Sequence, residues 1–229
     1  MIRAVLLDAA GTLISVAEPV GLSYARLAAP FGVTRAPEEI GRRFKAAMRA
    51  PWPGPRQRGD GRAFWRFVVA EATGSAHPEL FEAAYAYFAQ ASAWRVNLGV
   101  VEALSALRAS GLKLAVLSNW DTRLPGTLAA LGLSARVDRV VCSGALGVEK
   151  PHRAAFWLTC GLLGVLPNEA LHVGDDPDAD AAGANAAGLH VALLGRELRG
   201  FEGLPGLVHT LKTGDELDVA GLGEEVNAP

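Results

Sequence analysis

The chain has 229 residues, of which half are hydrophobic and a fifth are charged, so its composition excludes a disordered or fibrous protein. Its formal net charge of -2 offers no general attraction for nucleic acid or anionic lipid. No apolar run reaches the roughly 18 residues that span a bilayer, and the amino-terminus lacks a signal-peptide pattern. We therefore expect a cytoplasmic protein with neither nucleic acid nor a membrane as its partner.

Five short apolar runs, each ended by a polar cluster, predict the strands of a buried parallel sheet. They are residues 4–8, 113–119, 139–144, 170–176 and 189–195. Continuous apolar runs suit strands that are covered on both faces, because such strands have no solvent-facing side. Segments with helical spacing lie between them, at residues 100–109, 122–131, 153–163 and 178–187. This alternation predicts an α/β fold, a Rossmann-like core with a doubly wound parallel sheet.

One long segment interrupts the alternation directly after the first strand. It contains four helical candidates, at residues 22–32, 38–50, 62–74 and 78–90. We therefore predict a core domain of residues 1–15 and 93–229 with an inserted α-helical cap domain at 16–92. Such a cap would close over the carboxyl ends of the strands, where open α/β sheets bind ligands. Near the carboxyl end we expect a short edge strand at Leu207–Leu211, followed by a weakly ordered tail.

Polar residues follow four of the predicted strands and should meet at one edge of the sheet. They are Asp8, then Ser118 with Asn119, then Lys150 before Pro151, and finally Asp175 with Asp176 after Gly174. A carboxylate at the end of a buried strand is costly unless a cation or hydrogen-bond donors accompany it. The coincidence of four such clusters favours a functional site over four unrelated turns. Trp120, just after one cluster, is placed to line the mouth of that site.

The segments LLDAAGTL, LSN, EKP and HVGDDPDAD resemble, in order and spacing, the four motifs of the haloacid dehalogenase-like (HAD) hydrolase superfamily. The resemblance covers nearly the whole chain and indicates the subfamily with a helical cap after the first motif. Within it, LLDAAGTL followed by AEPVG is most similar to a branch related to a rhythmically expressed insect gene product.

The resemblance implies covalent catalysis by Asp8, which would attack an electrophilic centre and form an aspartyl intermediate. Ser118 and Lys150 would assist catalysis, and both would hold a phosphoryl group together with Thr12 and Asn119.

A magnesium ion is the cofactor that the same resemblance implies. Its ligands would be the carboxylates of Asp8 and Asp175 and the main-chain carbonyl of Ala10, since Mg²⁺ prefers oxygen ligands. Asp176 and Asp180 would support this site. Asp180 matches the position that orients metal-bound water or the lysine, although an acid in the first turn of a helix would also explain it. His172, inside a predicted strand, is expected to be a hydrogen-bonded core residue.

The chain departs from the phosphatase pattern at Ala10, where phosphatases of the superfamily carry a second Asp. That Asp protonates the leaving group and then activates water, and losing such a group costs about 10²–10⁴-fold in rate. Either another acid replaces it, with Glu18 as a candidate, or the substrate has a leaving group that needs no proton.

Three alternatives remain open beside phosphohydrolysis. Haloacid dehalogenases also lack the second Asp, but they work without Mg²⁺ and usually lack an acidic GDD segment. Phosphonoacetaldehyde hydrolases have a small residue at this position and a Schiff-base lysine in the cap, where Lys45 is the only lysine between residues 16 and 92. The third is a ligand-binding protein that has lost catalysis. We expect a HAD-like hydrolase acting on a small phosphorylated molecule with Mg²⁺, as a monomer or homodimer.

Overall fold

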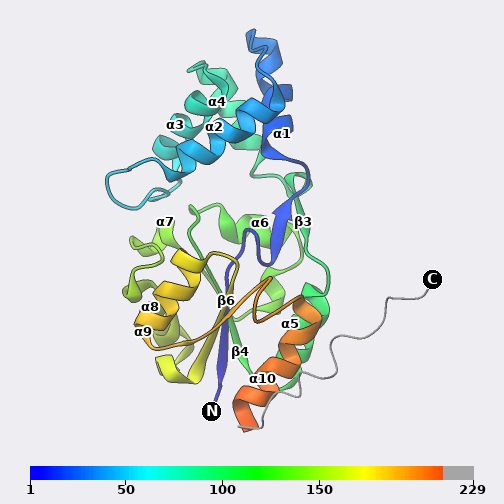
Figure 1. The fold of residues 1–229 in the computed structure, drawn as a ribbon, viewed down its shortest axis with the longest axis vertical. Coiled ribbons are helices and arrows are strands. Elements are labelled where there is room, and N and C mark those ends of the chain that lie inside the picture. The colour runs from blue at the N-terminus through cyan, green and yellow to red at the C-terminus, as the bar shows by residue number, and fades with distance from the viewer. Residues whose placement is uncertain (214–229) are drawn as a thin grey trace, which may run out of the picture.

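The computed structural model describes residues 1–213 and contains a parallel sheet between two helical layers, with four more helices beyond one end of the sheet (Figure 1). The strands are β1 Ala4–Leu7, β2 Ile14–Val16, β3 Trp94–Val96, β4 Lys113–Ser118, β5 Arg139–Cys142, β6 Ala170–Gly174 and β7 His190–Leu193. The α-helices are α1 Val20–Ala28, α2 Pro37–Arg49, α3 Arg62–Thr73, α4 Pro78–Tyr87, α5 Val100–Ala109, α6 Leu124–Ala130, α7 Ser143–Leu146, α8 Arg153–Leu163, α9 Gly183–Ala187 and α10 Leu204–Thr213. Short 3₁₀ turns lie at Ala29–Phe31, Ala91–Ala93, Ser134–Arg136, Pro167–Glu169 and Phe201–Gly203, and a π-helical turn at Pro177–Ala182.

The main sheet has the order β5-β4-β1-β6-β7, and every neighbouring pair in it is parallel. All five predicted core strands are therefore confirmed, as is the Rossmann-like α/β fold. The chain leaves β1 toward β4 and β5 and later returns on the other side of β1 to form β6 and β7. This reversal puts the crevice favoured for ligands at the carboxyl end of β1.

Both faces of the sheet are covered, which explains the continuous apolar runs. In β1, Val5 and Leu7 pack in a cluster with residues of α5, α6 and α10, whereas Ala4 and Leu6 pack with residues of α8 and α9. Figure 1 shows α5 and α10 on one side of the strands and α8 and α9 on the other. Alternate side chains of each strand thus enter different cores, so most polar residues lie at the strand ends, and His172 in the middle of β6 is an exception.

The predicted edge strand at Leu207–Leu211 is wrong, because these residues lie in the helix α10. Leu204 and Val208 are buried, and their spacing of four residues places both on one helical face. That face joins the core cluster that contains Leu104 of α5. The weakly ordered tail was predicted largely for residues 214–229, which lie outside the described residues.

The helices α1–α4, called the cap helices below, pack around their own apolar cluster, which includes Tyr24, Ile40 and Phe81. All four predicted helices of this segment are present. Helices α1 and α2 approach closely at Gly21, where an added Cβ would lie 2.0 Å from the carbonyl oxygen of Pro37. The proposed division at residues 16 and 92 stays a prediction.

The antiparallel strands β2 and β3 connect the cap helices to the core, with Ser15 paired to Arg95. This two-stranded ribbon was not predicted. Among the described residues, no helix combines the length and apolar character needed to cross a membrane.

Candidate active site

Asp8 directly follows β1, so the central strand delivers its carboxylate to the crevice at the switch point of the sheet. The residue is only 7% exposed, and its Oδ1 accepts a hydrogen bond from Lys150 Nζ at 2.7 Å. Asp8 and Lys150 are 142 positions apart in sequence and meet because both follow strands of the same parallel sheet. The predicted convergence of these two residues is thus present in the structure.

Lys150 bridges two carboxylates. Its Nζ also donates to Asp180 Oδ1 at 2.5 Å, and the lysine is 4% exposed. Burial opposes the charged ammonium, but the negative charges of Asp8 and Asp180 outweigh it and hold the pKa of Lys150 above its ordinary value. The lysine therefore remains a cation at neutral pH in a site where water cannot screen its charge.

Both carboxylate oxygens of Asp180 accept hydrogen bonds from other groups of the protein. Oδ1 accepts from Lys150 and lies 2.8 Å from His172 Nε2, while Oδ2 accepts from the backbone N–H groups of Asp175 and Asp176. Burial alone would raise the pKa of Asp180, but the hydrogen bond from His172 and the charge of Lys150 hold it well below its usual value. Asp180 therefore positions Lys150 and the backbone of Asp175.

His172 is confirmed as a hydrogen-bonded core residue, because it is 0% exposed and bonded to Asp180. Burial lowers its pKa, so the imidazole is neutral and donates from Nε2 to the carboxylate.

Gly174 makes room for this arrangement. A Cβ at residue 174 would lie 2.2 Å from the Asp180 carboxyl group, so a larger residue would displace the side chain that orients Lys150.

Asp175 lies in an environment that disfavours its charged form. Burial and the charge of Asp8 raise its pKa to about 6, although Thr12 Oγ1 donates to its Oδ1 at 3.1 Å. Gly11, at φ +87°, brings the backbone against this carboxylate, because a Cβ there would lie 2.3 Å from Oδ2. Two carboxylates held together in this way repel each other unless a cation lies between them.

The residues present fit a divalent cation. Carboxylate oxygens of Asp8, Asp175 and Asp180 lie within 4.8 Å of one another. Three carboxylates and the single ammonium of Lys150 give a formal charge of -2, which Mg²⁺ would neutralise. Because both oxygens of Asp180 already accept hydrogen bonds, Asp8 and Asp175 are the better candidate ligands, and their role as ligands stays a prediction.

The structure also places three further residues predicted for the site. Asn119 fixes the backbone of Lys150, accepting from its N–H at 2.7 Å and donating to its carbonyl oxygen at 2.8 Å. Ser118 ends β4 and is buried, but it is not among the described residues that line the cavity. Asp176 caps the turn at Pro177–Ala182, where its side chain accepts from the N–H groups of Asp178 and Ala179. A capping role thus accounts for the contacts of the Asp176 side chain.

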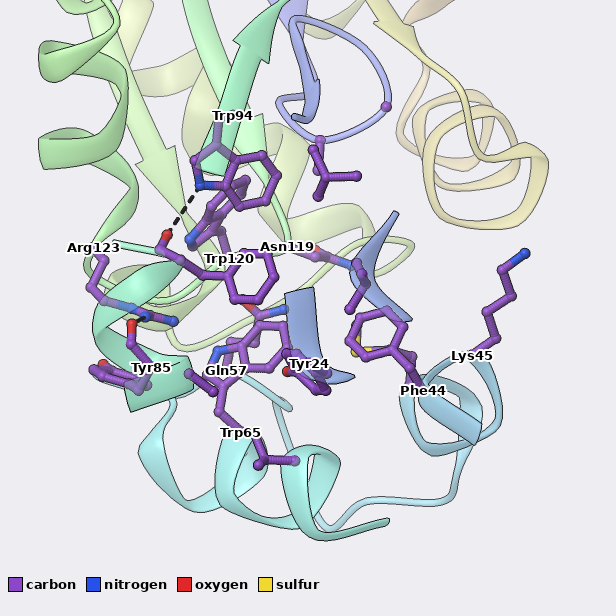
Figure 2. A pocket seen from close by; sticks show the side chains of 18 of the residues that line it. Tyr24, Phe44, Lys45, Gln57, Trp65, Tyr85, Trp94, Asn119, Trp120 and Arg123 are labelled. Carbon is purple, nitrogen blue, oxygen red and sulfur yellow. Dashed lines mark hydrogen bonds between the residues drawn. The ribbon is translucent and has the colours of Figure 1, made fainter. Parts of the chain in front are cut away.

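Ala10 and Gly11 lie in the wall of a cavity of about 590 Å³ between the core and the cap helices. Asp175 and Asn119 form part of the same wall, so the carboxylate cluster lies at one end of the cavity. Its remaining wall is mostly apolar and rich in aromatic side chains, Phe88 among them. Figure 2 shows the rings of Tyr24, Phe44, Trp65, Trp94 and Trp120 around one space. The expected position of Trp120 at the site is thus confirmed.

Sequence reasoning missed two residues that tie the cap helices to the core, Asp121 and Arg123. The buried Asp121 accepts from Trp65 Nε1 at 2.8 Å and from Arg123 Nη2 at 2.7 Å. Arg123 also lies 3.6 Å from the ring centroid of Tyr85 and donates to its carbonyl oxygen. Neither residue belongs to a motif, so no local pattern indicated this role.

Glu18, the candidate replacement for the missing Asp, and Lys45, the candidate Schiff-base lysine, have different surroundings. Glu18 accepts from Ser23 and pairs with Arg26, and these bonds lower its pKa, so it is ionised at neutral pH. It is also absent from the described residues that line the cavity. Lys45 lines the outer part of the cavity and is exposed; Figure 2 shows its side chain apart from the aromatic group.

Comparisons with known proteins agree with this geometry. A family model described as haloacid dehalogenase-like hydrolase matches residues 2–188. The human haloacid dehalogenase-like hydrolase domain-containing protein 3 is 33% identical over 205 residues, covering 84% of this chain and 82% of the relative. Phosphoserine phosphatase from Thermus thermophilus is 34% identical over 152 residues, covering 66% of this chain and 59% of that protein.

Among solved structures, the L-2-haloacid dehalogenase of Xanthobacter autotrophicus superposes with a TM-score of 0.72. It is 24% identical and covers 91% of this chain and 99% of the dehalogenase, a similarity that extends to the fold alone. The match of the family model over most of the chain, together with the human relative, establishes the family. The chain belongs to the haloacid dehalogenase-like hydrolases.

Proposed function

We propose that this hydrolase releases phosphate from a small phosphorylated molecule, with Mg²⁺ as cofactor and Asp8 as nucleophile. The observation that carries the proposal is the arrangement of Asp8 and Asp175 with Lys150 at the end of the cavity. Two close carboxylates provide a cation site, and the buried lysine supplies a fixed positive charge. Together they suit an anionic phosphoryl group better than an uncharged electrophile.

The chain's own residues would divide the reaction into two displacements. Asp8 attacks phosphorus, and the leaving group departs; water then hydrolyses the aspartyl phosphate and restores the carboxylate. Lys150, held by Asp180 and Asn119, keeps a positive charge beside Asp8 through both steps. Ser118 and Thr12 are proposed to bind phosphoryl oxygens, and Mg²⁺ bound at Asp8, Asp175 and the Ala10 carbonyl would supply charge neutralisation.

The test is phosphate release from a panel of phosphate esters and acetyl phosphate with Mg²⁺. Wild type is compared with Asp8→Asn, which keeps the size of the side chain but removes the nucleophile. Asp178→Asn is a matched control, because Asp178 is exposed beyond the cluster. We expect release that requires Asp8 and Mg²⁺ and is unaffected by the control. Equal release by wild type and Asp8→Asn would refute the proposal.

Ala10 favours a second candidate, dehalogenation, because a halide leaves without protonation. The acidic pair Asp8 and Asp175 weighs against it, and a small haloacid would fill only part of a cavity of about 590 Å³. Chloride release from 2-chloropropionate without added metal, in the absence of phosphate release, would establish this candidate.

Phosphonate cleavage depends on a Schiff-base lysine held in the site, whereas Lys45 is exposed. Borohydride trapping of an adduct on Lys45 would support it. Tight ligand binding without turnover of any substrate would indicate the non-catalytic alternative.

A further inference from the structure

We propose that the substrate is a phosphate ester of an aromatic alcohol, with an uncharged ring system as the leaving group and a hydrogen-bond donor directed at Gln57. This inference rests on the proposed phosphohydrolase function and adds the substrate class. It follows from three properties of the cavity: its aromatic wall, its buried unpaired acceptor, and the alanine at position 10.

The aromatic wall extends from the cap helices to the carboxylate cluster of Asp8, Asp175 and Asp180. Tyr24 of α1 contacts Phe88 with ring centroids 5.7 Å apart, Phe88 lies 6.0 Å from Trp94, and Trp94 lies 4.7 Å from Trp120. Trp120 follows Asn119, which fixes Lys150. A flat ring joined to a phosphate at the cluster can therefore contact aromatic faces along its length. The volume of about 590 Å³ is within the range that holds drug-sized ligands.

The charges in the wall favour an uncharged leaving group. Among the described residues that line the cavity, the charged ones besides Asp175 are Lys45 and Arg123. Lys45 is exposed, and Arg123 is already paired with the buried Asp121 and stacked on Tyr85. A second anionic group on the ligand would therefore enter the aromatic region without an available buried cation, at a high desolvation cost.

Gln57 supplies the polar recognition. The residue is 7% exposed and lines the cavity, and its Oε1 is buried without a hydrogen-bond partner. Figure 2 shows Gln57 among Tyr24, Trp65 and Trp120. An unsatisfied buried acceptor is costly, so a ligand that carries an N–H or O–H group there gains a hydrogen bond and removes that penalty.

Ala10 adds a second reason for an aromatic leaving group. Without an acid at position 10, the leaving group should be a weak base, and an aryloxide is a weaker base than an alkoxide. A phenolic oxygen, like that of tyrosine, has a pKa of about 10, whereas an alkoxide is nearly as basic as hydroxide. As the Asp8 oxygen bonds to phosphorus, the bond from phosphorus to the aryl oxygen breaks and its electron pair departs with the aryloxide. The aryloxide then takes a proton from solvent, and water releases inorganic phosphate from Asp8. No protein acid is needed at position 10.

The first experiment measures kcat/KM with Mg²⁺ for 2-naphthyl phosphate, glycerol 3-phosphate and acetyl phosphate. Acetyl phosphate is small and has a leaving group that needs no proton, so it reports the phosphoryl chemistry without the cavity. We expect 2-naphthyl phosphate to exceed glycerol 3-phosphate by about 10²-fold or more. Turnover of acetyl phosphate with no preference for the naphthyl ester would overturn this inference alone. No turnover of any of the three would overturn the phosphohydrolase proposal itself.

The second experiment separates recognition by the cavity from the reactivity of aryl esters. Ala84 of α4 lines the cavity, whereas Ala86 on the same helix is exposed. We expect Ala84→Leu to lower kcat/KM for 2-naphthyl phosphate about tenfold or more while acetyl phosphate turnover persists, and Ala86→Leu to change neither. Loss of acetyl phosphate turnover as well would mean that Ala84→Leu is misfolded.

Gln57→Met then tests the polar contact, because it replaces the side-chain amide with an apolar group of similar length. It should abolish the preference for 6-amino-2-naphthyl phosphate over 2-naphthyl phosphate. Equal turnover of the two esters by wild type, or full naphthyl activity in a folded Ala84→Leu variant, would overturn the inference.

Discussion

Restoring a carboxyl group at position 10 should convert the enzyme into one that accepts basic leaving groups. The Ala10→Asp variant places a proton donor two residues after Asp8, at an exposed position in the cavity wall. The main-chain carbonyl proposed as a metal ligand is unchanged by this substitution. The variant therefore isolates the missing acid from the rest of the site.

The expected gain depends on the leaving group. A positioned acid contributes about 10²–10⁴-fold, which corresponds to about 3–5 kcal/mol of barrier. We expect kcat for glycerol 3-phosphate to rise within that range. The rate for acetyl phosphate should rise much less, because its leaving group needs no proton and the new carboxylate can act only on the water that hydrolyses the aspartyl phosphate. The ratio of the two rates is thus the informative quantity.

The assay is steady-state phosphate release by wild type, Ala10→Asp and Ala10→Asn with both substrates. Asn matches the size of Asp but has no carboxyl proton, so it controls for steric effects and for altered polarity. A gain by Ala10→Asp of the same size for both substrates, a gain reproduced by Ala10→Asn, or no gain would refute the reasoning about the leaving group.

The remaining predictions concern stability and reactivity. Asp180→Asn removes one partner of the buried pair with Lys150 and should lower the free energy of unfolding in urea by about 3–5 kcal/mol; a loss as small as that of the exposed Asp178→Asn would contradict this. Gly174→Ala should lower the free energy of unfolding by about 1–3 kcal/mol, because its Cβ would displace the Asp180 carboxyl group. Gly161→Ala, in open space within α8, should raise it by about 0.5–1 kcal/mol, and reversed signs would refute the steric argument. Burial raises the pKa of the Cys160 thiol to about 11. This thiol should therefore resist labelling by a thiol reagent at pH 8 in the native protein and react once the chain is unfolded in urea. Equal labelling rates in the native and unfolded protein would contradict this.

The core fold was predictable because its determinants are local and repeated. Every strand of the main sheet is an apolar run, since alternate side chains of strands such as β1 enter two different cores. The meeting of Asp8 and Lys150 followed from one geometric rule, that parallel strands bring their carboxyl ends to the same edge. The chemical roles of these residues remain predictions.

Features that depend on tertiary packing were missed. The three-residue strands β2 and β3 are too short to show a period, and the helix α10 contains Val208 and Thr210, residue types enriched in strands. Its helical state is stabilised by the packing of Leu204 and Val208 in the same cluster as α5. The aromatic cavity combines residues from all four cap helices, the ribbon of β2 and β3, and the loop after β4, so no single stretch of sequence revealed it.

The ribbon of β2 and β3 makes the helical segment a replaceable module. Ala17 donates its N–H to the carbonyl oxygen of Ala93 at 2.8 Å, so the chain leaves the core and returns to it at adjacent points. A segment with neighbouring ends can be exchanged between relatives without altering the spacing of Asp8, Lys150 and Asp175. Selection can therefore change what the cavity accepts, by recombination of a single inserted stretch, while the sheet and its carboxylates are inherited intact.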